Sequence, residues 1–155
     1  MRWRNYVIGC LVGGASLVIT CNWVHAGSKT YVGSKKCAEC HEQEYQKWSK
    51  YTKKSHSFED VMKMKHDLTP EELKSCYGCH TTGYGDPTGF RDPVSTPDLK
   101  EVGCEACHGP GSAHVESNSP ADIKVKITMR DCERCHNAAR VGNFGFKPLV
   151  HAGAH

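Results

Sequence analysis

Hydrophobic positions are sparse in this chain, and where they recur they follow helical rather than strand spacing. This period predicts a first helix from Val32 to about Ser55, for which Ser34 is a candidate cap. The side chains that carry the period are Glu44, Tyr45, Trp48 and Tyr51. A second short helix, Phe58–Lys65, is expected to begin behind Ser57.

The third predicted helix has the clearest start signal of the chain. Thr69 is a candidate N-cap, Pro70 suits the first helical position, and Glu72 completes a capping box with Thr69. The helix is expected to run on into residues 76–80.

Between and after these helices the chain is irregular. Glycines and prolines are spread through residues 81–99, and residues 109–112 form a predicted tight turn. Another loop is predicted at 117–120, and Ile123–Ile127 alternates in the way of a brief strand. The predicted fold is therefore mostly α, with long irregular loops and little or no β-sheet.

The first 26 residues have the pattern of a secretory signal peptide. Arg2 and Arg4 form a positive start, and Tyr6–Thr20 is an apolar stretch without a charge. The predicted cleavage position follows Ala26. The predicted organisation is a signal peptide, 1–26, followed by one exported domain, 27–155, in the periplasm or outside the cell. A retained membrane anchor and a lipoprotein modified at Cys21 are the alternatives, although the apolar run is shorter than the ~20 residues of a membrane span.

Charge argues against one class of partner. The whole chain has 20 basic and 17 acidic side chains, and Arg2 and Arg4 belong to the leader. The exported domain therefore keeps 18 basic against 17 acidic side chains, a net charge of +1. This near balance lacks the basic footprint of nucleic-acid binding.

Eight of the ten cysteines lie in four Cys-x-x-Cys pairs, and a histidine follows each pair at once. The pairs are Cys37/Cys40, Cys76/Cys79, Cys104/Cys107 and Cys132/Cys135, and the adjoining histidines are His41, His80, His108 and His136. This is the attachment pattern of c-type haem. Two thiols on one side of a helical turn bond the porphyrin vinyl groups, and the next imidazole binds iron. We name these sequences motif 1 to motif 4 in chain order.

Three other interpretations of the pairs explain less. Zinc knuckles give no reason for a histidine after every pair, a thioredoxin-like site needs one pair rather than four, and disulfides across three residues close strained loops. Four covalently bound haem c groups also supply the large apolar surfaces that the chain itself lacks. We therefore expect a compact multihaem domain whose haem-free form is unfolded or molten.

Each haem iron has a second axial position, and five further histidines follow the leader. These are His56, His66, His114, His151 and His155. Imidazole is a common axial ligand, so at least three of them are expected to bind iron. Met129 is a weaker candidate, as are Met62 and Met64, which suit packing on a short helix. An iron with both positions filled relays electrons, whereas an open iron can bind a small molecule.

The residues around the motifs resemble the four-haem cytochrome c-554 family over nearly the whole exported length. The similarity is carried by Tyr31–Ser34, Trp48, Ser55–Ser57, Cys79–Tyr84, Gly89–Phe90 and, most specifically, Gly103–His114. The resemblance implies closely stacked and perpendicular haem pairs in a protein that shuttles electrons between redox partners outside the cytoplasm. In the nitrifier member, hydroxylamine oxidoreductase supplies the electrons, three haems are bis-histidine and the second is five-coordinate.

Carried over position by position, the resemblance also implies which histidines share an iron. From the first haem to the fourth, the pairs are His41 with His114, His80 with His66 or no second ligand, His108 with His151 or His155, and His136 with His56. This chain is much shorter than the nitrifier member. The alternatives at the second and third haems therefore stay open.

Taken together, the sequence predicts an exported tetrahaem cytochrome that transfers electrons between redox proteins, either other cytochromes or an oxidoreductase, and that has no catalytic residue. Two other functions stay open: a nitrogen-oxide reductase, if the haem on His80 is five-coordinate, and a subunit of an extracellular haem filament. Membrane association is expected only if the leader is retained. Lys47, Lys50, Lys53 and Lys54 either steer an acidic partner or form an ordinary solvated helix face.

Overall fold

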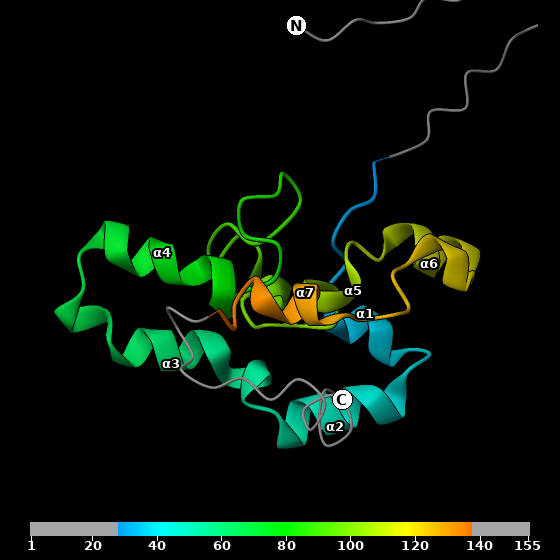
Figure 1. The fold of residues 1–155 in the computed structure, drawn as a ribbon, viewed down its shortest axis with the longest axis horizontal. Helices are drawn as coiled ribbons and strands as arrows, with labels where there is room; N and C mark the ends of the chain where they lie inside the picture. Colours follow the sequence, from blue (N-terminus) through cyan, green and yellow to red (C-terminus); the bar gives the residue numbers. More distant parts are fainter. Residues whose placement is uncertain (1–27, 138–155) are drawn as a thin grey trace, which may run out of the picture.

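Short helices joined by long loops make up the part of the chain that the structure, a computed structural model, describes: residues 28–137 (Figure 1). The α-helices are α1 (Ser34–Ala38), α2 (Glu42–Tyr51), α3 (Ser57–Lys63), α4 (Pro70–His80), α5 (Glu105–His108), α6 (Ser112–Ser117) and α7 (Met129–Glu133). The 3-10 turns are η1 (Lys53–His56), η2 (Lys65–Asp67), η3 (Pro97–Leu99) and η4 (Pro120–Asp122). No strand occurs within residues 28–137, which confirms the predicted fold class. The predicted signal peptide and the C-terminal His151 and His155 lie outside the described residues.

The first predicted helix is broken at motif 1. The His41 amide donates to the carbonyl of Cys37 at 2.8 Å, and His41 then leaves the helical region with φ −114° and ψ 50°. The chain resumes as α2 one residue later. The prediction that Ser34 caps its own helix is wrong, because its Oγ accepts from the amide of Cys104 at 3.1 Å instead.

Helices α3 and α4 lie side by side and run in opposite directions, with η2 at the turn between them (Figure 1). The predicted capping box is confirmed: the Glu72 amide donates to Thr69 Oγ1 at 3.3 Å, and the Thr69 amide donates to Glu72 Oε2 at 2.9 Å. From this start α4 continues to His80 and carries motif 2 in its last turn. Helix α3 begins one residue before its predicted start.

The predicted loop after motif 2 is irregular as expected, apart from η3. It is anchored at Thr82, a buried residue whose amide donates to Leu99 O and whose carbonyl accepts from the Phe90 amide, both at 2.9 Å. The predicted strand at Ile123–Ile127 is wrong. No partner strand lies beside it within the described residues, and the Lys124 amide instead donates to His108 O at 3.2 Å.

The apolar core of the described residues is small. Phe58, Phe90 and Leu99 form one buried cluster, with Tyr31, Met62 and Tyr77 packed against it. Buried polar side chains are as prominent, and Glu105 and Thr82 are each 2 % exposed. So small an apolar core contributes little stability to a domain. A small core is consistent with a protein whose interior is completed by haem. Among the described helices, none is long and apolar enough to cross a membrane.

Candidate haem sites

All four motifs form the helical turn that haem attachment requires. The histidine amide donates to the carbonyl of the first cysteine at 2.8 Å in motif 1, 3.0 Å in motif 3 and 2.8 Å in motif 4, while motif 2 belongs to α4. None of the eight motif cysteines is in a disulfide. Within the described residues, no three side chains of His, Cys, Asp or Glu converge in a way that could hold a bare metal ion.

Cys40, the second cysteine of motif 1, is exposed, whereas the other seven attachment cysteines are partly buried. The reason is local: the Cys40 amide donates to Cys37 O at 3.2 Å just after α1, and the chain leaves the helix at His41, so this turn lies at the surface. A haem bonded to Cys40 would have that edge near solvent, and its attachment there stays a prediction.

Motifs 1 and 3 come together through their first cysteines. A hydrogen bond between the two thiols raises the pKa of Cys37 and lowers the pKa of Cys104 to about 6. Burial also raises the pKa of Cys37, and the Ser34 hydroxyl helps to lower that of Cys104. Residues 67 positions apart in the sequence therefore present their attachment points side by side.

Motifs 2 and 4 meet in the same way. Burial raises the pKa of the Cys135 thiol to about 12, and the adjacent thiol of Cys79 raises it further by its charge and a hydrogen bond. Cys107 of motif 3 lies near both cysteines of motif 4, since its charge also raises the pKa values of Cys132 and Cys135. The attachment points thus follow one another in space in the order motif 1, motif 3, motif 4, motif 2.

The imidazoles of His41 and His114 face each other, with ring centroids 6.2 Å apart and planes inclined by 25°. His114 Nδ1 lies 2.9 Å from the carbonyl oxygen of Ser119. A carbonyl only accepts, so Nδ1 carries the proton and Nε2 keeps its lone pair. A metal–imidazole bond is about 2 Å long, so rings on the two sides of one iron have centres roughly 6 Å apart. These residues fit an iron between them, and their pairing on the first haem stays a prediction.

His108 and His80 differ in what their ring nitrogen Nδ1 contacts. His108 Nδ1 lies 2.7 Å from the carbonyl oxygen of Lys124, which leaves Nε2 as the nitrogen for a metal. His80 Nδ1 is buried and has no hydrogen-bond partner, the one such side-chain atom in residues 28–137. A buried ring nitrogen without a hydrogen bond is costly, and Nδ1 of His80 therefore differs from Nδ1 of His108.

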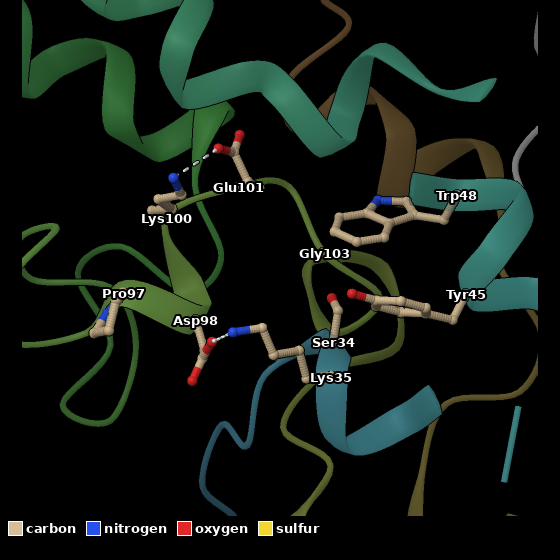
Figure 2. A pocket seen from close by; sticks show the side chains of 9 residues that line it. All are labelled: Ser34, Lys35, Tyr45, Trp48, Pro97, Asp98, Lys100, Glu101 and Gly103. Atoms are coloured by element: carbon tan, nitrogen blue, oxygen red, sulfur yellow. Dashed lines mark ion pairs between the residues drawn. The ribbon is translucent and has the colours of Figure 1, made fainter. Parts of the chain in front are cut away.

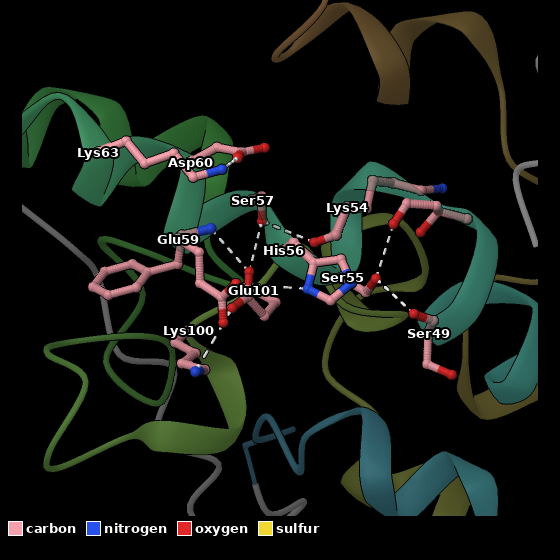
Figure 3. A network of polar contacts seen from close by, with 12 residues as sticks. Ser49, Lys54, Ser55, His56, Ser57, Glu59, Asp60, Lys63, Lys100 and Glu101 are labelled. Atoms are coloured by element: carbon pink, nitrogen blue, oxygen red, sulfur yellow. Dashed lines mark hydrogen bonds and ion pairs between the residues drawn. The ribbon is translucent and has the colours of Figure 1, made fainter.

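His56 lies in η1, exposed, with Nδ1 3.7 Å from the Glu59 carboxylate (Figure 3). Burial raises the pKa of the Cys132 thiol, whereas the nearby charge of Lys54 lowers it. Lys54, in the same 3-10 turn as His56, is thus near enough to motif 4 for its charge to act on Cys132. The pairing of His56 with His136 stays a prediction. His136 itself is exposed.

His66 and His80 are not brought together. His66 is exposed in η2, ahead of the start of α4, whereas His80 is the last residue of α4. A helix of that length, 11 residues, spans about 16 Å. Of the two alternatives for the second haem, the structure therefore favours an iron to which His66 is not bound.

Two hollows lie near the motifs. A pocket of about 120 Å³ lies between α1, α2, η3 and the chain that follows η3. Tyr45 and Trp48 lie on one side of it, and Lys35, paired with Asp98 at 2.8 Å, lies on the other (Figure 2). It is too small for a haem, because ligand pockets have volumes of roughly 300–1,000 Å³. An open groove of about 490 Å³ runs past His56 and is lined by side chains of α2, η1 and α3.

Polar side chains that sequence reasoning did not single out hold the motifs in place. The Ser57 hydroxyl lies 2.9 Å from His80 O and accepts from the Val102 amide at 2.9 Å. The Glu101 carboxylate accepts from the Phe58 amide at 2.8 Å and so caps α3 (Figure 3). Glu105, between the cysteines of motif 3, is the most buried of these carboxylates. Nothing in the local sequence marks them, because the hydrogen-bond donors to the Glu101 carboxylate, and most partners of Ser57 and Glu105, lie far away along the chain.

Comparisons with known proteins agree with this geometry. Residues 36–109, which hold motifs 1 to 3, match the family model described as cytochrome c554 and c-prime. Cytochrome c-554 of Nitrosomonas europaea is 35% identical over 117 residues, which cover 68% of this chain and 49% of that protein. The chain thus matches about half the length of this curated relative.

A solved structure shares the fold. It is the reduced state of cytochrome c554 from Nitrosomonas europaea, with a TM-score of 0.60 and 23% sequence identity. The match covers 81% of this chain and 84% of that one. Family model, sequence relative and fold agree, and the chain belongs to the cytochrome c-554 family of c-type cytochromes.

Proposed function

We propose that this protein carries electrons between redox proteins outside the cytoplasm, with haem c bound at all four motifs. The observation that carries the proposal is the closeness of the attachment points. Hydrogen bonds join Cys37 with Cys104 and Cys135 with Cys79, and Cys107 is near enough to Cys132 for its charge to raise the pKa of that thiol. Electron transfer between bound groups falls steeply with their separation. A chain that places its attachment points next to one another meets that requirement.

The residues of the chain divide the work of binding. The paired thiols anchor each haem covalently, the motif histidines supply the proximal imidazoles, and the haem iron, when bound, accepts and returns one electron. His41 and His114 face each other at the separation that two ligands of one iron need. Filling both axial positions keeps small molecules away from the metal, which suits a carrier rather than an enzyme.

Partner docking is expected on the outer side of α2 and η1. Lys47, Lys50 and Lys53 are exposed there, next to the open groove beside His56. Their positive charge would steer an acidic redox protein toward this surface at a rate that falls as salt is added.

The test is a haem count and a redox titration of the chain produced in a host that attaches c-type haem. Intact mass is expected to equal the polypeptide plus four haems, and full reduction is expected to take four electrons per chain. The Cys132→Ser/Cys135→Ser variant is the matched control, because it should retain three haems. A wild-type protein with fewer than four haems, or haems that exchange no electrons with other cytochromes, would contradict the proposal.

A nitrogen-oxide reductase at motif 2 is the second candidate. It is favoured at His80, because His66, the predicted second ligand, lies in η2 before α4 begins, whereas His80 is the last residue of that helix. Carbon monoxide added to the reduced protein separates the two functions. A Soret shift from one haem in four supports an open iron, and an unchanged spectrum removes this candidate.

A further inference from the structure

Glu105 is a buried carboxylate that accepts hydrogen bonds from three backbone amides in two separate segments. Its side chain is 2 % exposed. Oε1 and Oε2 accept from the Val32 amide at 3.0 and 3.1 Å, Oε2 accepts from the Gly33 amide at 2.7 Å, and Oε1 accepts from the Gly111 amide at 2.7 Å. A buried charge is costly unless such donors surround it, and three backbone amides aimed at one carboxylate form an anion-binding nest.

Two of the three amides, those of Gly33 and Gly111, belong to residues that begin an element with a haem ligand or attachment point. Gly33 is the N-cap of α1, which holds Cys37 of motif 1. Gly111 is the N-cap of α6, which holds His114. Glu105 itself opens α5, whose last residue is the motif 3 histidine. One side chain therefore ties together motif 1, motif 3 and the predicted second ligand of the first haem.

Further hydrogen bonds join the same two segments, residues 30–34 and 104–112. The Thr30 amide donates to Ser112 Oγ at 2.8 Å, and the Ser112 amide donates to Thr30 O at 3.1 Å. The Cys104 amide donates to Ser34 Oγ at 3.1 Å. These bonds hold residues 30–34 along residues 104–112, with the carboxylate of Glu105 at the centre.

We propose that Glu105 is the positioning residue that aligns His41 with His114 and joins motif 1 to motif 3. Hydrogen bonds are directional, so three amides on one carboxylate set the angle between α1, α5 and α6 as well as their distance. The 25° inclination of the two imidazoles is the consequence at the site. The proposal rests on the proposed binding of haem at motifs 1 and 3.

The experiment compares the four-haem wild-type protein with Glu105→Gln by low-temperature electron paramagnetic resonance. The amide keeps the shape of the side chain but replaces one acceptor oxygen by a donor, which cannot accept from Val32, Gly33 or Gly111. We expect the low-spin signal of the His41/His114 iron to shift its g values, since these depend on the angle between the imidazole planes. Loss of a nearby negative charge should also raise the reduction potential of that haem.

Glu101→Gln is the matched control, because Glu101 is also a largely buried glutamate that accepts from a backbone amide, but at α3. It should leave the His41/His114 signal unchanged. Gly111→Ala tests the proposal without removing the charge: its Cβ would lie 3.1 Å from Glu105 Oε1, and Gly111 has an ordinary φ of −93°. A smaller shift of the same signal is expected.

The outcomes separate the two proposals. A wild-type protein without haem at motifs 1 and 3 would contradict the proposed function itself. Four haems in every variant, with unchanged g values and potentials in Glu105→Gln and Gly111→Ala, overturn the role of Glu105 alone. If Glu105→Gln yields no folded protein, the Gly111→Ala spectrum decides: a selective shift supports the role, and an unchanged signal refutes it.

Discussion

Motifs 1 and 3 are joined by hydrogen bonds, whereas motif 2 is held against aromatic rings. In the first region, residues 30–41 and 103–114, buried Ser34 and Glu105 bond backbone amides of the opposite segment. In the second, residues 57–64 and 77–90, Phe58, Tyr77 and Phe90 lie with their ring centroids 5.4 to 5.8 Å apart. We call these the polar half and the aromatic half.

The two halves differ in how they hold their histidines, His41 and His114 in the polar half and His80 in the aromatic half. Hydrogen bonds fix direction, and the polar half presents two imidazoles at a defined angle and separation. Apolar packing is not directional and excludes water, and the Nδ1 of His80 is buried in the aromatic half. The polar half is therefore the proposed place of a six-coordinate iron, and the aromatic half that of an iron to which His66 is not bound.

The largest effect is expected from Phe90→Ala in the aromatic half. Phe90 is 1 % exposed, and replacing such a ring by a methyl group costs about 3–5 kcal/mol of unfolding free energy. Chemical denaturation of the haem-loaded protein measures the loss, while the resonance signal of the His41/His114 iron should stay unchanged. Val94→Ala, at a position 88 % exposed, is the control. An altered His41/His114 signal in Phe90→Ala would show that the halves are not independent.

A smaller effect is expected from Ser34→Ala in the polar half. The variant leaves the part-buried Cys104 amide without its acceptor, which costs about 1–3 kcal/mol. Here the His41/His114 signal should shift together with stability, in contrast to Phe90→Ala. Ser75→Ala removes an exposed hydroxyl of α4 and should change stability by less than about 0.5 kcal/mol. If Ser34→Ala has the same free energy of unfolding as wild type, the hydrogen bond from the Cys104 amide to Ser34 does not stabilise the polar half.

The smallest effect concerns the acid stability of motif 4. The Lys124 ammonium, together with hydrogen bonds from Thr128, holds the pKa of the Asp131 carboxyl below its usual value. A carboxyl with a lowered folded pKa stabilises the protein above its unfolded pKa of about 3.9, and this contribution is lost as the pH falls further. Wild type should therefore lose stability between about pH 4 and pH 2 more steeply than Asp131→Asn.

Thermal melts of both proteins across that range measure this difference. Repeating the melts in 1 M salt is the control, because screening weakens an ion pair that is partly exposed on the lysine side. Parallel pH curves for Asp131→Asn and wild type would show that the Lys124–Asp131 contact has no part in acid stability.

Much of the local structure could be predicted from the sequence. The capping box of α4 and the four Cys-x-x-Cys-His turns depend on residues within four positions of one another, and all are present. The predictions of a strand at Ile123–Ile127 and of a continuous first helix were wrong. An alternating pattern forms a strand only beside a neighbouring strand, and none lies there among the described residues. A helical period does not reveal that His41 leaves the helix. The exposure of Cys40 follows from that same break and could not be predicted from its motif.

The sequence by itself determined the chemistry of this protein, because covalent haem attachment depends on cysteines and histidines that are consecutive in the chain. Only the tertiary structure decided which motifs are neighbours, which histidine faces His41 and what Glu105 binds. Several of those contacts join residues far apart in the chain, 67 positions for Cys37 and Cys104 and 72 positions for Gly33 and Glu105. Long-range hydrogen bonds follow from how the loops pack together, and no local pattern of polar and apolar positions specifies them.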